Sequence, residues 1–182
     1  MALPPGTHTL GPGHGDLKVK TYREGMASKA GHDLVIEVSR WEATLSVGED
    51  GAPSGLELSV DPRSLEVREG VGGVKPLSDR DRLEIRKNID EKVLGGHPII
   101  FRCSAAQLSA GGGRISLPGE LAMAGKAAPG TAELTMEADG RVTGTISLTQ
   151  SDWGIKPYRG LMGALKVRDE LDVVFEGRLP AG

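Results

Sequence analysis

The chain has 182 residues, of which 38% are hydrophobic and 26% charged, a balance typical of a folded globular protein. The formal net charge is −3, only 3% of residues are aromatic, and no basic stripe is visible, which argues against a nucleic-acid partner. The single cysteine, Cys103, excludes a disulfide framework, and we interpret the chain as one domain (1–182, with a core from about 7 to 179).

The first part of the chain shows the period-two alternation of half-buried β-strands. Apolar side chains alternate over 17–21, over 34–38 and, on the opposite parity, over 41–47. A change of parity inside one long strand predicts a β-bulge near Ser39–Arg40, because one extra residue returns the apolar side chains to the same face. A further strand is predicted over 56–60.

The segment over about 79–94 interrupts this rhythm, because its apolar residues recur at i, i+4 and i+8 among charged ones. Ser78 and Asp81 resemble a capping box, with aspartate in place of the usual glutamate. Gly95-Gly96 and then Pro98 supply a C-cap and a stop. These signals predict one amphipathic helix that either packs on the sheet or plugs one end of a barrel.

Alternation returns in the second half of the chain. Strands are predicted over 99–103, 115–123, 134–136, 142–148 and 171–175. Asp139-Gly140, between two alternating runs, predicts a tight hairpin of type I′, which needs a positive φ at both central residues. Short strands joined by tight turns indicate antiparallel pairing, hence a sandwich or a barrel.

No catalytic or metal-binding constellation is evident in the sequence. The four histidines form no spaced pair on the helix and no second cysteine joins them, so we predict no metal site. There is no Gly-x-Ser-x-Gly elbow, and no catalytic residue is assigned. The loop over 70–75, rich in glycine, matches no phosphate-binding pattern and is interpreted as a mobile surface loop that could gate a barrel mouth.

The stretch 150–158 groups Trp153 and Tyr158 with Lys156, in a chain that has few aromatic residues. One interpretation is an amphipathic rim, with aromatic rings along an apolar ligand and the lysine near a polar head group. The alternative is a barrel-closing corner in which Trp153 fills the end of the core. The sequence does not choose between the two.

Several motifs, taken in order, resemble the YceI-like family of lipocalin-fold polyisoprenoid-binding proteins. Their order and spacing carry the resemblance, which runs from about 7 to 179. The matching segments are His14 before the first long strand, Asp61-Pro62-Arg63-Ser64-Leu65, Asp81-Arg82-Leu83, His97-Pro98-Ile99-Ile100-Phe101, Gly119-Glu120-Leu121-Ala122-Met123-Ala124-Gly125 and Asp152-Trp153-Gly154-Ile155. His97 replaces a tyrosine of the family pattern, and Trp153 replaces a phenylalanine.

The resemblance implies an extended eight-stranded antiparallel lipocalin-like β-barrel with one helix and a long apolar channel. It further implies binding of an isoprenoid-type lipid such as a polyprenyl phosphate or a quinone, with no required cofactor and no defined catalytic residues. The apolar channel residues expected on inward faces are Val19, Leu45, Leu58, Phe101, Leu134, Ile146, Trp153, Leu165 and Phe175. The expected polar rim consists of His32, Asp152, Lys156 and Tyr158.

Two other functions stay open at this point. The four rim residues could serve as acid or base in a hydrolase or isomerase acting on a lipid-like substrate at the barrel mouth. The barrel could instead be filled by its own side chains and act as a structural or interaction module, including a homodimer. No stretch is long and apolar enough for a membrane helix, and the N-terminal residues lack a basic and an apolar leader region. We therefore expect a cytoplasmic location, although many members of the family that the chain resembles are periplasmic.

Overall fold

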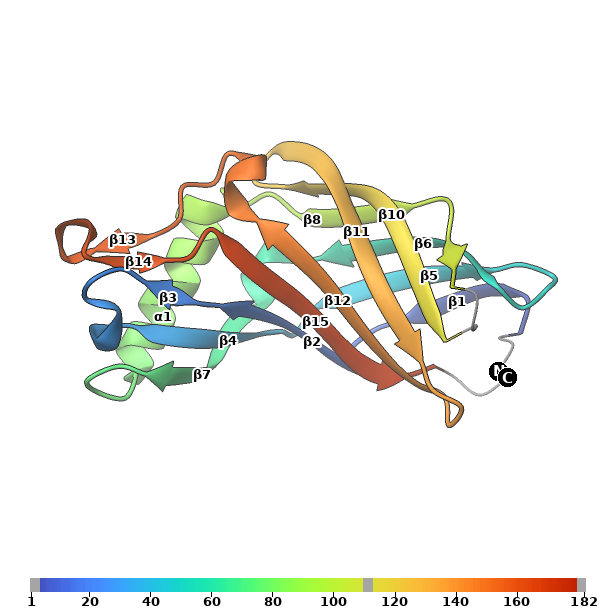
Figure 1. Ribbon diagram of the computed structural model, residues 1–182, viewed down its shortest axis with the longest axis horizontal. Coiled ribbons are helices and arrows are strands. Elements are labelled where there is room, and N and C mark those ends of the chain that lie inside the picture. The colour runs from blue at the N-terminus through green and yellow to red at the C-terminus, as the bar shows by residue number, and fades with distance from the viewer. Residues whose placement is uncertain (1–3, 110–112, 180–182) are drawn as a thin grey trace.

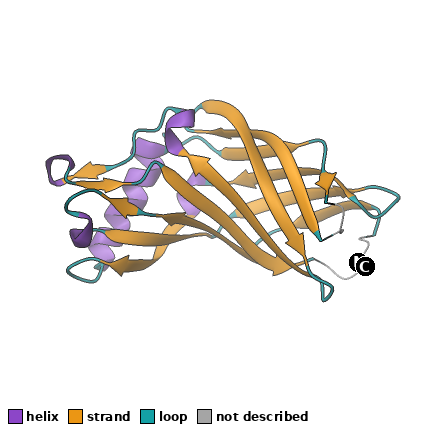
Figure 2. Cartoon of the chain, in the orientation of Figure 1, coloured by secondary structure: helices purple, strands orange, loops and turns teal. Residues whose placement is uncertain are grey.

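The computed structural model describes residues 4–109 and 113–179, which form a curled antiparallel sheet with one helix at one end (Figures 1 and 2). The strands are β1 (Gly6–Leu10), β2 (Gly15–Thr21), β3 (Arg23–Glu24), β4 (His32–Val38), β5 (Trp41–Val47), β6 (Pro53–Val60), β7 (Leu65–Gly72), β8 (Ile99–Cys103), β9 (Gln107–Leu108), β10 (Arg114–Met123), β11 (Lys126–Met136), β12 (Arg141–Thr149), β13 (Arg159–Gly160), β14 (Leu165–Val167) and β15 (Glu170–Arg178). The helical segments are α1 (Asp79–Asn88), its π-helical continuation η3 (Ile89–Val93), and the short 3₁₀ turns η1 (Ser28–Ala30), η2 (Pro62–Ser64), η4 (Gln150–Trp153) and η5 (Leu161–Gly163).

The main sheet is a strongly curled half-barrel, so the expected closed barrel of eight strands is wrong. Eleven strands follow one another in the order β1-β5-β6-β8-β10-β11-β12-β15-β2-β4-β7, and β9 pairs with β10 beside this path. Within the described ranges, the end strands β1 and β7 each pair with one neighbour only, β5 and β4 respectively. The hydrogen-bonded sheet is therefore open between β1 and β7. The two sides of this opening are connected only by the chain, which passes from β4 directly into β5.

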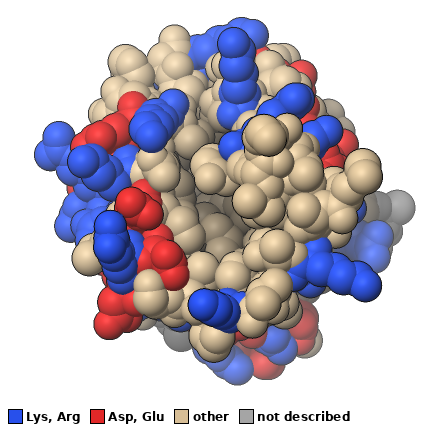
Figure 3. Space-filling view, turned by 90° about the vertical axis from the view of Figure 1, so that its left-hand side faces the viewer, with Lys and Arg blue, Asp and Glu red and all other residues tan. Residues whose placement is uncertain are grey.

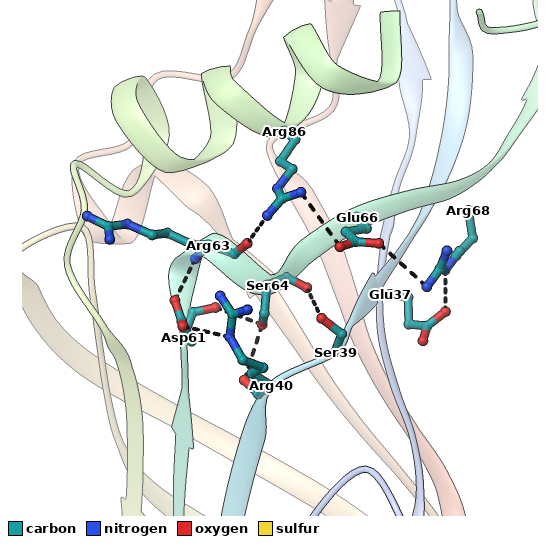
Figure 4. A network of polar contacts seen from close by, with 9 residues as sticks. All are labelled: Glu37, Ser39, Arg40, Asp61, Arg63, Ser64, Glu66, Arg68 and Arg86. Atoms are coloured by element: carbon teal, nitrogen blue, oxygen red, sulfur yellow. Dashed lines mark hydrogen bonds and ion pairs between the residues drawn. The ribbon is translucent and has the colours of Figure 1, made fainter. Parts of the chain in front are cut away.

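The interruption lies at Ser39–Arg40, where a bulge within one long strand was predicted. That prediction is wrong, because the chain breaks there into two strands, and the register of β4 against β7 shifts between Val35 and Ile36 instead. Ser39 and Arg40 separate β4 from β5. The turn η2 separates β6 from β7 and lies next to these two residues. The fully buried hydroxyl of Ser64 donates to the backbone carbonyls of Arg40 (3.2 Å) and Asp61 (2.8 Å). The Ser39 amide donates to the Ser64 carbonyl (3.0 Å), and Arg40 forms an ion pair with Asp61 (2.9 Å; Figure 4). The bend thus has its own polar network in place of ladder hydrogen bonds.

The predicted helix is confirmed, with α1 and η3 together covering 79–93. Both halves of the capping box form, because the Ser78 hydroxyl accepts from the Asp81 amide and the Asp81 carboxylate accepts from the Ser78 amide. The helix packs on β7 at one end of the molecule, where the Arg82 guanidinium donates to the carbonyls of Val67 and Arg68, both at 2.8 Å. Of the two predicted positions for the helix, packing on the sheet is therefore the one observed.

Two hairpin turns differ in type from what the Asp-Gly pair predicts. The Asp139-Gly140 hairpin exists, but the predicted type I′ turn is wrong, because only Gly140 has a positive φ (83°). The Glu137 amide donates to the Arg141 carbonyl (2.9 Å), and the Asp139 carboxylate accepts from the Arg141 amide (3.0 Å). This is a three-residue loop closed by a left-handed glycine. Two positive φ angles occur instead at Ala124 (51°) and Gly125 (76°), in the two-residue turn between β10 and β11.

A small second sheet lies beside the helical end of the main sheet (Figure 1). It has the order β13-β14-β3, and none of its strands was predicted, because each has only two or three residues. The main core fills the interior of the curled sheet, and its most deeply buried large side chains are Phe101, Ile115 and Leu117. The molecule therefore has two distinct ends, one built around β1, β5 and β6 and the other around the helix and the small sheet.

Candidate ligand-binding cavity

A partly open apolar cavity lies in the half of the curled sheet that is built around β1, β5 and β6. Its volume is about 100 Å³. The side chains around it come from the inward faces of β1, β2, β5, β6, β10, β11, β12 and β15. The lining consists of Leu10, Leu17, Trp41, Ala43, Leu45, Pro53, Leu56, Leu58, Ile115, Ala132, Leu134, Met136, Val142, Gly144, Thr145, Ile146, Val173, Phe175 and Leu179. Apart from Gly144 and Thr145, every one of these residues is apolar.

Residues on neighbouring strands pack the walls of the cavity on either side of β12. On β12 the inward position between two larger residues is Gly144, which pairs with Leu134 on β11 and with Phe175 on β15. A Cβ atom at Gly144 would lie 2.6 Å from Cδ2 of Leu134, so the neighbouring leucine occupies the room that a side chain would need. Trp41 and Phe175 form an edge-to-face pair with ring centroids 5.7 Å apart, which closes the wall on the other side.

The cavity ends where the packing of the interior becomes tight. Ile115 on β10 lines the cavity, whereas Leu117 and Leu121, farther along the same face of the strand, are fully packed in the core. Phe101 pairs with Leu121 and is only 1% exposed. Trp153 completes this layer, since its indole N–H donates to the Leu121 carbonyl at 2.7 Å. A ligand in the cavity would therefore meet a packed layer toward the helical end.

The volume limits what the cavity holds. An engineered apolar cavity of about 150 Å³ binds benzene. The cavity of about 100 Å³ is smaller, so it accommodates a few methyl or methylene groups. Each buried methylene contributes about 0.8 kcal/mol, and a polar group placed there would lose its hydration without compensation. The cavity thus favours the apolar end of a molecule.

The structure divides the nine expected channel residues into two groups. Leu45, Leu58, Leu134, Ile146 and Phe175 lie together in the cavity lining. The other four lie outside it, and their places differ. Val19 packs against the main core, while Phe101 and Trp153 belong to the packed layer. Leu165 lies in β14 of the small sheet, against Gly31, because the chain leaves the main sheet after η4 and rejoins it only at β15.

The four expected rim residues lie toward the helical end of the molecule, away from the cavity. The Nε2 atom of His32 is 2.7 Å from the Lys75 carbonyl. Asp152 is exposed in η4, and Lys156 and Tyr158 are exposed before β13. Among the described residues, no hydrogen bond or ion pair joins any two of these four. Figure 3 shows this end of the molecule hollowed at its centre, with charged side chains around the hollow.

Several lining residues were not predicted from the sequence, some because their segment gave no strand signal and others although it did. Leu10 comes from β1, whose short alternation next to glycine and proline gave no strand prediction. Ala43, Ile115 and Val142 lie on strand faces that the alternation correctly predicts to point inward. The same pattern was therefore sufficient to include them among the lining residues. Leu179 follows β15 at the end of the described range and carries no such signal.

A polar cluster on the outer surface joins the small sheet to the main one. The Tyr22 hydroxyl donates to Asp172 (2.6 Å), the Ser147 hydroxyl donates to the same carboxylate (2.6 Å), and the Arg168 guanidinium lies 5.6 Å from the centroid of the Tyr22 ring. The hydrogen bond from Ser147, followed by that from Tyr22, lowers the pKa of Asp172. The hydrogen bond to Asp172, together with burial, raises the pKa of Tyr22. The pair stays in its hydrogen-bonded form over the neutral range.

The described part of the chain shows neither a metal centre nor a membrane-spanning helix. Within residues 4–109 and 113–179, no three side chains of the His, Cys, Asp and Glu types come close enough to hold a metal ion. No described helix is long and apolar enough to cross a bilayer.

Comparisons with known proteins support the fold. No protein-family profile matches the sequence, and no curated protein was found to match it. Among solved structures, the fold is similar to that of BcnA from Burkholderia cenocepacia, with a TM-score of 0.59 and 18% sequence identity. The match covers 88% of this chain and 94% of that one. BcnA is a YceI-like protein of lipocalin fold, so the antiparallel, barrel-like architecture expected from the resemblance is supported.

Proposed function

We propose that the protein binds an apolar, chain-like small molecule whose end occupies the cavity of the curled sheet. The observation that carries this proposal is the cavity of about 100 Å³, lined almost entirely by aliphatic and aromatic side chains. An isoprenoid-type lipid, such as a polyprenyl phosphate or a quinone, suits the site because its tail ends in methyl-branched carbon. The YceI-like sequence motifs and the similarity to BcnA support the same class of ligand indirectly.

The energetics favour a ligand with more apolar carbon than the cavity holds. Three or four buried methylene groups contribute about 2 to 3 kcal/mol, which is less than the usual loss of translational and rotational freedom on binding. A longer chain therefore needs further contacts. We expect these to form when side chains of the packed layer, Leu117 and Phe101 above all, change rotamer and extend the cavity toward the hollowed end.

A chain-length series tests the proposal. Native mass spectrometry of protein purified without detergent, followed by titration with prenol, geraniol, farnesol and geranylgeraniol, measures both resident and added ligand. We expect saturable uptake that strengthens from the C5 to the C15 alcohol. The proposal would be overturned if the purified protein contained no ligand and bound none of the four alcohols and no fluorescent polyene fatty acid.

One observation favours a second candidate, a structural or interaction module whose interior is filled by its own side chains. The cavity is small, and the neighbouring layer around Leu117 and Phe101 is fully packed. Under this alternative the same titrations give no uptake, and the protein instead forms a defined oligomer. No such observation favours the hydrolase or isomerase alternative: within residues 4–109 and 113–179, no hydrogen bond or ion pair joins any two of its four expected residues, His32, Asp152, Lys156 and Tyr158.

A further inference from the structure

Three segments far apart in the sequence form the rim of the hollowed end. They are residues 22–31, 70–77 and 154–168, and together we call them the rim segments. The first and third are joined by the β3–β14 pairing and by a hydrogen bond from the Ala27 amide to the Ala164 carbonyl (2.9 Å). The second lies beside the first, since His32, directly after it, contacts the Lys75 carbonyl. Figure 1 shows these loops together at one end.

The rim segments carry most of the exposed large hydrophobic side chains in the described chain. Of the eight such side chains, six lie in these segments. They are Met26, Val71, Val74, Tyr158, Leu161 and Met162. Met26 is 99% exposed and Met162 102%, so neither has any packing role in the isolated molecule. A concentration of this kind marks an interaction surface, whereas scattered single residues would need no explanation.

The backbone at the tip of the third segment is strained in a way that keeps these side chains outward. Leu161 and Met162 have positive φ angles of 48° and 57°, a region that costs non-glycine residues energy. They are consecutive, and Gly163 follows with a φ of 88°. Strain held at an exposed apolar tip is more readily understood as serving an interaction than as serving the fold.

The charge of the rim segments is opposite to that of the rest of the chain. They contain seven basic residues and one acidic residue, so they carry +6, while the whole chain carries −3 and the remainder therefore −9. The basic residues are Arg23, Lys29, Lys75, Lys156, Arg159, Lys166 and Arg168. Within the residues that the structure describes, only Arg23 among these seven has a carboxylate within 4.0 Å, from Asp33 (3.8 Å). Figure 3 shows Lys and Arg side chains around the hollow, together with Asp and Glu side chains on one side of it.

We propose that the rim segments dock on the surface of an anionic lipid bilayer, with the apolar tips in the interfacial region and the basic side chains among the head groups. Apolar side chains interspersed with lysines and arginines are the pattern of interfacial membrane binding. Protein–protein interfaces, by contrast, are depleted in lysine, and four of the seven basic residues here are lysines. The net negative charge of the remaining surface would orient the molecule with this end toward the bilayer.

Docking in this orientation would place the hollow of Figure 3 against the lipid. An apolar ligand could then pass between bilayer and protein without crossing water. The docking proposal does not depend on the proposed function, because none of the rim segments contributes a residue to the cavity lining. A protein that binds vesicles but no isoprenoid would disprove ligand binding alone, and the reverse result would disprove docking alone.

Vesicle co-sedimentation tests the proposal with the full chain and no added ligand. The vesicles are phosphatidylcholine alone, or phosphatidylcholine with 30% phosphatidylglycerol. We expect binding to the anionic vesicles only, weakening as salt is raised. Each neutralised lysine lowers the affinity about fivefold, so Lys156→Gln with Lys166→Gln should lower it about 25-fold. Met26→Ser with Met162→Ser removes the two most exposed tips without changing the charge. Because two apolar side chains would no longer enter the bilayer interface, binding should also weaken about tenfold or more.

Matched controls come from the other end of the molecule. Leu108 on β9 is 51% exposed, and Arg114 begins β10. Leu108→Ser and Arg114→Gln should leave vesicle binding within twofold of the parent protein. Circular dichroism and thermal unfolding confirm that each variant is folded. The serine pair tests the apolar contribution and the glutamine pair tests the electrostatic contribution, so each serves as an independent test of docking. Equal binding to neutral vesicles, no binding to either kind, or equal losses in controls and rim variants would overturn the proposal. Self-association abolished by the serine pair, without vesicle binding, would assign the surface to a second copy of the chain instead.

Discussion

Filling the cavity with the protein's own side chain provides the sharpest test of where the ligand binds. Ala132 lies on the inward face of β11, is 3% exposed, pairs with Leu117 and lines the cavity. Ala132→Leu adds three carbon atoms at this position. A cavity of about 100 Å³ has room for them, so the change fills existing space instead of displacing the wall.

The expected changes in stability and in ligand affinity are both calculated from about 0.8 kcal/mol for each buried carbon. Three carbons contribute up to about 2.4 kcal/mol of burial, and imperfect packing in a core costs about 1 to 3 kcal/mol, so we expect the free energy of unfolding to change by less than about 1.5 kcal/mol. A ligand excluded from the same three sites loses about 2.4 kcal/mol, which weakens binding about 50-fold.

Two measurements with one control variant decide the outcome. Urea unfolding gives the stability of Ala132→Leu, and fluorescence titration with a polyene fatty acid, displaced by farnesol, gives its ligand affinity. Ala127→Leu makes the same chemical change on the same strand at an exposed, outward position. The control should bind like the parent protein.

A folded Ala132→Leu protein that binds with undiminished affinity would refute the reasoning. Such a result would mean that the ligand does not enter the cavity. If Ala127→Leu lost affinity to the same extent, the site would have to lie on the outer face of β11 instead.

Three further outcomes follow from particular contacts. Trp153→Phe removes the donor to the Leu121 carbonyl and should lower the free energy of unfolding by about 1 to 3 kcal/mol in urea titrations, whereas an unchanged value would mean that the bond contributes nothing. Ala124→Asn places a residue that tolerates positive φ in the β10–β11 turn and should raise Tm by about 1 to 4 °C; a fall in Tm would contradict the turn assignment. Because the folded-state pKa of Asp172 is lowered, its contribution is present above its ordinary value of 3.8 and is lost as pH falls through the folded pKa. Asp172→Asn should therefore reduce the difference in unfolding free energy between pH 6 and pH 3, and an unaltered difference would show that this carboxylate is not part of the acid response.

The sequence predicts most of the secondary structure because local patterns determine it. Period-two alternation identified most of the long strands, although it missed β7 and the first part of β11. The parity change located a discontinuity at Ser39–Arg40, but the predicted bulge is a break between two strands. The helix was found with its capping box and glycine stop, since these signals lie within a few residues of one another. Turn type was less accessible, because Asp139-Gly140 fits two kinds of hairpin loop and the backbone hydrogen bonds choose between them.

The candidate site depends on contacts that local patterns do not contain. Alternation shows which side chains point inward but not how far along the interior they lie. Phe101 and Leu45 therefore looked equivalent in the sequence, although one is in the packed layer and the other faces the cavity. The absence of a side chain at Gly144 matters only because Leu134 and Phe175 pair with it, and Leu134 occupies the room that a side chain there would need.

The sequence by itself determined that this protein is an antiparallel β structure with one capped helix and an apolar interior, because hydrophobic periodicity and turn residues act over a few neighbouring positions. Only the tertiary structure decided that the sheet is an interrupted half-barrel with a small cavity. It also brought residues 22–31, 70–77 and 154–168 into one basic, apolar-tipped rim. These features arise where segments distant in the chain meet, and their geometry depends on side-chain volumes and strand register across the whole sheet.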